Sequence, residues 1–108
     1  MRLVIVTSDP MTGSLIDEVR KIAGNVPIIC TGIEEAISYI RSHERDYQRR
    51  VEAVLLDVHG LDDSSKRRLK RVARENGIDD AHIKLIELLG NTQQVLAWLR
   101  ELDERSRR

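Results

Sequence analysis

The chain of 108 residues contains no phenylalanine, and aromatic residues make up only 3% of it. Tyr39, Tyr47 and Trp98 supply all the rings, and each falls on an expected helix rather than beside a cleft. The core must therefore be almost wholly aliphatic. Few rings remain to stack on nucleobases or to wall a flavin, so we expect no cofactor.

Cysteine is nearly as scarce, since Cys30 is the only one. No internal disulfide can form and no cysteine-based metal cluster is available, which fits a reducing compartment. The first apolar run, Leu3 to Val6, is too short for a signal peptide or a membrane span. We therefore expect a cytoplasmic protein that does not engage a membrane.

An excess of charge of either sign is also missing, because 18 Lys and Arg balance 18 Asp and Glu. A surface devoted to nucleic acid or anionic lipid would carry a positive excess. One segment is an exception, with basic side chains at Lys66, Arg67, Arg68, Lys70, Arg71 and Arg74. They face mostly away from the apolar Leu69 and Val72, and no aromatic residue lies among them. We interpret them as a solvated helix face and do not expect a nucleic-acid partner.

Apolar residues follow two alternating patterns along the chain. Short continuous runs predict strands at 3–6, 26–30, 51–58 and 83–89. After each run, apolar residues recur at the spacing of one face of a helix, which predicts four helices. These apolar residues are Leu15, Ile16, Val19, Ile22 and Ala23; Ile33, Ala36, Ile37 and Ile40; Leu69, Val72 and Ala73; and Val95, Leu96, Leu99 and Leu102. This is one domain, residues 1–108, built from four strand–helix units.

Alternation of this kind demands parallel strands joined by right-handed crossovers, with helices on both faces of the sheet. The fold class is α/β, a three-layer α/β/α sandwich. Because the first and third runs are the most apolar, they belong in the middle, which gives the strand order 2-1-3-4. Pro27 indicates that the second strand lies at an edge.

The helix ends carry polar signals. Thr31 precedes Glu34 by three residues, which predicts a capping box at the second helix. The polar segment from Arg41 to Arg50 is expected to continue that helix into solvent. Either Asp62 or Asp63 is placed to cap the third helix.

A ligand site in such a sheet lies beyond the carboxyl ends of the strands, where the connections change direction. Thr7, Ser8 and Asp9 follow the first strand there, and Asp57 and His59 lie at the end of the third. We expect the Asp57 carboxylate to be partly desolvated and to face Asp9. The alternative is that Asp57 hydrogen-bonds a neighbouring loop amide or caps a helix. His59 is close enough in sequence to hydrogen-bond Asp57.

Three segments together resemble a known family. Leu3-Val4-Ile5-Val6 with its polar cluster, the segment 31–36, and Val54-Leu55-Leu56-Asp57-Val58-His59-Gly60 resemble the flavodoxin-like receiver domain of bacterial two-component response regulators. The resemblance covers about two-thirds of the chain. It implies that Asp57 corresponds to the phosphoryl-accepting aspartate, and that an acidic pair after the first strand would help to hold Mg²⁺.

The departures from that family are as informative as the matches. Thr7 and Ser8 stand where the acidic pair belongs, and neutral hydroxyls do not replace two carboxylates around a hard dication. No hydroxyl residue ends the fourth strand, and a fifth strand–helix unit is absent from the length. We therefore expect neither a metal site nor enzymatic activity.

The favoured interpretation is a degenerate receiver-like domain, a pseudo-receiver, that binds a protein partner or a second copy through the edge of its fourth strand and its last helix. A second interpretation is a designed or engineered α/β scaffold without biological activity, because the periodicity is clean, the helices are capped and Phe is absent. A third is an active receiver that uses Asp57 with a sparse metal site.

Overall fold

A computed structural model describes residues 1–9, 13–43, 45–46 and 50–106. Its strands are β1 (Leu3–Val6), β2 (Ile28–Cys30), β3 (Ala53–Asp57) and β4 (Ile83–Ile86). All of them are parallel, and their order β2-β1-β3-β4 is the one that the sequence predicts. The most apolar strands, β1 and β3, occupy the middle, and β2 with its Pro27 lies at an edge as expected.

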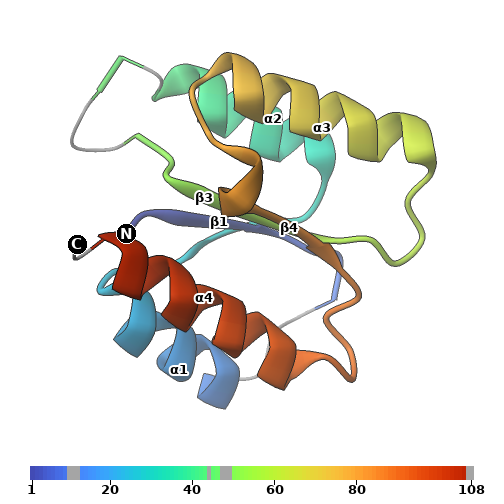
Figure 1. Ribbon diagram of the computed structural model, residues 1–108. Coiled ribbons are helices and arrows are strands. Elements are labelled where there is room, and N and C mark those ends of the chain that lie inside the picture. Colours follow the sequence, from blue (N-terminus) through green and yellow to red (C-terminus); the bar gives the residue numbers. More distant parts are fainter. Residues whose placement is uncertain (10–12, 44, 47–49, 107–108) are drawn as a thin grey trace.

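Four α-helices cover the sheet in two pairs. They are α1 (Gly13–Ala23), α2 (Ile33–Ser42), α3 (Asp63–Glu75) and α4 (Thr92–Ser106), with a short 3-10 turn, η1 (Asp80–His82), before β4. Figure 1 shows α2 and α3 on one face of the sheet and α1 and α4 on the other, which makes the predicted three-layer sandwich of the flavodoxin-like type.

Alternate residues of the central strands serve the two faces. Val4, Val54 and Leu56 pack under α2 and α3. Ile5 and Leu55 pack with Val95, Leu96 and Leu99 of α4 in the other layer. Because β1 and β3 are buried on both faces, their runs are continuously apolar and show no polar alternation.

The helix starts differ in part from the sequence prediction. Asp62 caps α3, since its side chain accepts a hydrogen bond from the Ser65 amide at 2.7 Å. The predicted capping box of Thr31 and Glu34 is wrong: α2 begins one residue later, with Gly32 at the N-cap.

At α2 the side chain of Glu35 reaches back instead. Its carboxylate accepts hydrogen bonds from the Thr31 amide and hydroxyl, both at 3.0 Å. Glu34 turns to α3 and pairs with Arg68. Because the helix starts one residue later than predicted, Glu35 rather than Glu34 binds Thr31, and Glu34 is left to pair with Arg68 of α3.

Three strands and one helix are shorter than predicted, and the first of these strands, β2, begins at Ile28 rather than at residue 26. β3 begins at Ala53 and ends at Asp57, and β4 ends at Ile86, so residues 87–89 belong to the following loop. α2 ends at Ser42, so the expected continuation through residues 43–50 is wrong where the structure describes the chain. Tyr47 lies outside the described residues.

Trp98 ties the last helix to the strand that it covers. Its indole N–H donates to the carbonyl of Ala81 at 3.1 Å, in the turn directly before β4, while its ring packs against the α1–α4 layer. Over the residues that the structure describes, the helices are all too short or too polar to cross a membrane.

Candidate functional site

Asp57 is the last residue of β3 and one of the two buried polar residues at the carboxyl end of the central strands, with 6% of its surface exposed. The other is Thr7, which is 4% exposed. The register pairs Val6 with Leu56, so the next residues along, Thr7 and Asp57, lie opposite each other and on the same face. This placement follows from strand register and could not be read from either segment alone.

The Thr7 hydroxyl donates to Asp57 Oδ2 at 2.7 Å. Thr7 Oγ1 in turn accepts a hydrogen bond from the Asp9 amide at 3.1 Å. A short O–H···O⁻ bond is among the stronger hydrogen bonds in proteins. One carboxylate oxygen of Asp57 is thereby held by the loop that follows β1.

The second carboxylate oxygen is also engaged. Oδ1 accepts from the backbone amide of His59 at 3.2 Å and, in a longer contact of 3.5 Å, from the amide of Leu88. Asp57 therefore links the loops that follow β1, β3 and β4. The alternative drawn from the sequence, that Asp57 hydrogen-bonds a neighbouring loop amide, is the one seen in the structure, where the His59 amide donates to Asp57.

Beside this link lies a hollow of about 180 Å³, lined by Asp9, Asp57, His59, Glu87 and Leu89. Asp9 and His59 line it as the sequence led us to expect. Ser8 is exposed but does not line it, and Thr7 lies buried behind the Asp57 carboxylate.

His59 contacts Asp57 through its backbone amide. Its imidazole Nδ1 lies 3.7 Å from the carboxylate of Glu87, and the His59 side chain is 69% exposed. The expected hydrogen bond between His59 and Asp57 therefore exists, but the main chain makes it. The main-chain hydrogen bond orients the loop after β3, and the His59 imidazole lies beside Glu87 instead of binding Asp57.

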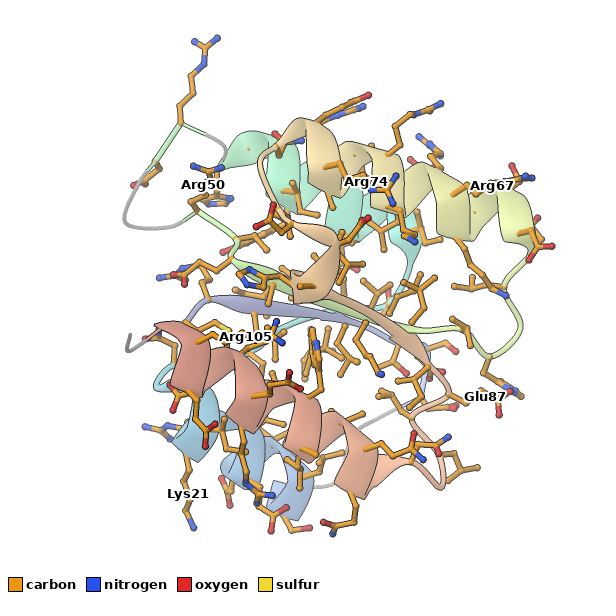
Figure 2. The ribbon with its side chains drawn as sticks, in the orientation of Figure 1. Lys21, Arg50, Arg67, Arg74, Glu87 and Arg105 are labelled. Carbon is orange, nitrogen blue, oxygen red and sulfur yellow. The ribbon has the colours of Figure 1, made fainter. Side chains whose placement is uncertain are left out.

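Glu87 and Leu89 are the lining residues that the sequence did not lead us to expect, and Glu87 is the charged one. We expected it inside a strand over 83–89, but β4 ends at Ile86 and Glu87 turns into the loop (Figure 2). The acidic Glu87 in the second half of the predicted strand 83–89 was the signal in the sequence that could have indicated this position. The Asn91 amide group donates to the Glu87 carbonyl at 2.8 Å and helps to fix that loop.

The side chains at this end of the sheet do not fit the Mg²⁺ that the receiver resemblance implies. Within the described part of the chain, no three His, Cys, Asp or Glu residues are grouped so that they could hold a metal ion. Thr7 contributes a hydroxyl that is already bonded to Asp57, and both Asp57 oxygens accept hydrogen bonds from the protein itself. A hard dication prefers several carboxylate and water oxygens around it.

Cys30 does not form a reactive centre. It ends β2 with 1% of its surface exposed, and burial, with a smaller contribution from the nearby Glu35 charge, raises the pKa of its thiol to about 11. A thiol with so high a pKa is a poor nucleophile at neutral pH.

His43 lies on another part of the molecule, where its ring stacks on Tyr39 with 4.3 Å between centroids.

No family model, no curated protein and no solved structure matches this chain. The geometry of the chain itself therefore supplies the argument for its function.

Proposed function

We propose that this domain is a non-catalytic, receiver-like module that binds another protein. One observation supports it above all: the Asp57 carboxylate, the counterpart of a phosphoryl acceptor, is buried and accepts a 2.7 Å hydrogen bond from Thr7. The group that would carry the chemistry holds three loops together instead.

Phosphoryl transfer makes demands that this site meets poorly. The accepting oxygen must reach the phosphorus in line with the leaving group, and the charge on the phosphoryl oxygens must be neutralised. Here Oδ2 is turned toward the Thr7 hydroxyl, and Asp9 and Glu87 add negative charge beside it. A dianionic phosphoryl group would be repelled there unless cations compensated for those carboxylates.

The contact surface that we propose is the edge of β4 together with α4. The Ile86 carbonyl accepts from the Val58 amide, so Ile86 directs its peptide groups toward β3. In a parallel pair this direction alternates, and the amide and carbonyl of Leu85 therefore face the open edge. A partner strand, or a second copy of this chain, would gain main-chain hydrogen bonds there.

The opposite edge, β2, is less suited to receive a strand. Pro27 has no N–H, and the Thr31 amide is already bonded to the Glu35 carboxylate. These features leave the amide of Ile29 as the open N–H donor of β2, without a further donor two residues before or after it. We propose a cytoplasmic location, where the single thiol of Cys30 stays reduced.

Amide hydrogen exchange followed by NMR tests the β4 surface directly. The exchange rate of the Leu85 amide should fall as the protein concentration rises or as a partner is added. The Lys84 amide faces β3 and serves as a matched internal control whose rate should stay the same. If exchange at Ile29 slows and Leu85 is unchanged, the partner uses β2 and the β4 proposal is wrong.

A titration with Mg²⁺ and then beryllofluoride, an aspartyl-phosphate mimic, tests the absence of catalysis. We expect no localised amide shifts at residues 6–9 and 57–60. Saturable shifts at both loops that disappear in Asp57→Asn would reveal a working acidic pocket and favour the active-receiver alternative. A monomer that shows no change in either experiment would favour the alternative of a scaffold without biological activity.

A further inference from the structure

The outer face of α3 is strongly basic. An open hollow of about 640 Å³ runs along it, lined by Ser64, Arg67, Arg68, Lys70, Arg71, Arg74 and Glu75. Leu69, Val72 and Ala73 bury the other side of the helix, so Arg67, Arg71 and Arg74 project away from the core. Figure 2 shows the labelled Arg67 and Arg74 on this helix, on the opposite side of the sheet from α1 and α4.

Two arginines of this helix already bind carboxylates of the same chain with two hydrogen bonds each. Arg74 donates to both oxygens of Asp80, at 2.6 and 2.8 Å, and these hydrogen bonds, together with the positive charges of Arg74 and Lys70, lower the pKa of Asp80 below its usual value. Arg68 donates to both oxygens of Glu34. A guanidinium group matches the planar carboxylate in this two-point geometry.

The central part of the helix carries more positive than negative charge. Arg67 and Lys70 form no ion pair within the described part of the chain, and Arg71 lies 4.0 Å from Glu75 in an exposed, weak pair. Arg67 and Arg71 are one helical turn apart, about 6 Å along the axis. Two carboxylates at positions i and i+4 of another helix have the same spacing.

We infer that this face, centred on Arg67, Lys70 and Arg71, binds an acidic helical segment of another protein. Nucleic acid suits the face less well. The helix carries no aromatic side chain for base stacking, Asp62 and Asp63 stand at one end, and the net charge of zero provides little long-range attraction for a polyanion. The site is separate from β4 and goes beyond the function proposed above.

Fluorescence anisotropy with a labelled helical peptide of about 15 residues, with glutamates at i and i+4 along one face, tests the inference. The unmodified domain should bind it, more weakly at about 0.15 M salt than at low salt, because the charges are exposed and screened. The same peptide with glutamine in place of glutamate should not bind.

The variant Arg67→Glu/Arg71→Glu should weaken binding about tenfold or more, because two attractive charges become repulsive. Arg20→Glu/Lys21→Glu is the matched control: it changes the net charge equally at exposed positions of α1, and Lys21 lies on the far side of the sheet (Figure 2). The control should retain the affinity within about twofold. Far-UV circular dichroism and thermal melting should show that both variants are folded.

Three results would overturn the inference. One is the absence of peptide binding at low salt, and another is an equal loss of affinity in both variants, which would indicate nonspecific attraction. The third is that a single-stranded oligothymidine or a DNA duplex binds at least as tightly as the peptide, which would assign the face to nucleic acid. None of these results alters the exchange of the Leu85 amide, so failure here is distinguishable from failure of the β4 proposal.

Discussion

Thr7→Val is the substitution that most directly tests the link at the carboxyl end of the sheet. Valine has nearly the shape of threonine but lacks the hydroxyl that donates to Asp57 Oδ2 at 2.7 Å. Thr7 and Asp57 are buried, with 4% and 6% of their surfaces exposed, so water cannot readily replace the lost hydroxyl donor.

A net hydrogen bond to a charged group contributes about 1.5–3 kcal/mol, and a buried acceptor left without its donor adds a desolvation penalty. We therefore expect Thr7→Val to lower the free energy of unfolding by about 2–3 kcal/mol. For a domain of this size that corresponds to a fall in Tm on the order of 10 °C.

Urea unfolding followed by far-UV circular dichroism measures the change, and a double-mutant cycle isolates the pair. Thr7→Val, Asp57→Ala and the double variant should give a coupling free energy of about 1–3 kcal/mol. Ser8→Ala alters an exposed hydroxyl in the same loop and should change stability by less than about 0.5 kcal/mol. A loss of stability in Thr7→Val no larger than in this control, or two single changes that add without coupling, would refute a stabilising bond between Thr7 and Asp57.

Further predictions concern the turns, the thiol and the helix cap. Gly77 has φ +83°, and a Cβ added there would push the flexible Arg50 guanidinium away from its hydrogen bond to the Asn76 carbonyl. Gly77→Ala should therefore lower Tm more than Gly60→Ala, where φ is +74°, the surrounding space is open and the change costs about 1 kcal/mol; equal losses in thermal melts would contradict this. Because burial raises the pKa of the Cys30 thiol to about 11, iodoacetamide should react slowly unless urea unfolds the chain. The unfolded thiol loses its proton near pH 9.0 and the folded one near 11, so stability should fall across this window, and less so in Cys30→Val. The hydrogen bond from the Ser65 amide lowers the pKa of Asp62 below the ordinary value of 3.8. The ionised Asp62 cap should therefore stabilise the fold above pH 3.8, and this stabilisation should be lost as the pH falls below that value. In Asp62→Ala, the free energy of unfolding should not show this acid-dependent loss.

The candidate site was predictable only in outline. The rule that ligands lie beyond the carboxyl ends of parallel strands led to Asp57, Asp9 and His59, and all three line one hollow. The rule did not find Glu87, because we expected the fourth strand to run through it to residue 89, whereas its hydrogen bonding to β3 ends at Ile86. It also left open whether Asp57 was available or engaged, since that depends on partners distant in sequence.

What the sequence by itself determined is the set of elements and their layering. Continuous runs such as Val54-Leu55-Leu56, bounded by polar residues, are typical of strands buried on both faces. Pro27 favours an edge strand, and the spacing of Val95 and Leu99 is typical of a helix with one buried side. These are local patterns, and each is fixed by the chemistry of neighbouring residues.

What only the tertiary structure decided is which polar groups meet. The bond between Thr7 and Asp57 spans 50 residues and exists because β1 and β3 pair in one register. Glu34 binds Arg68 rather than capping its own helix because α2 and α3 lie side by side. A hydrogen bond or ion pair between distant residues depends on angstrom-scale register and packing, which the pattern of any one segment does not contain.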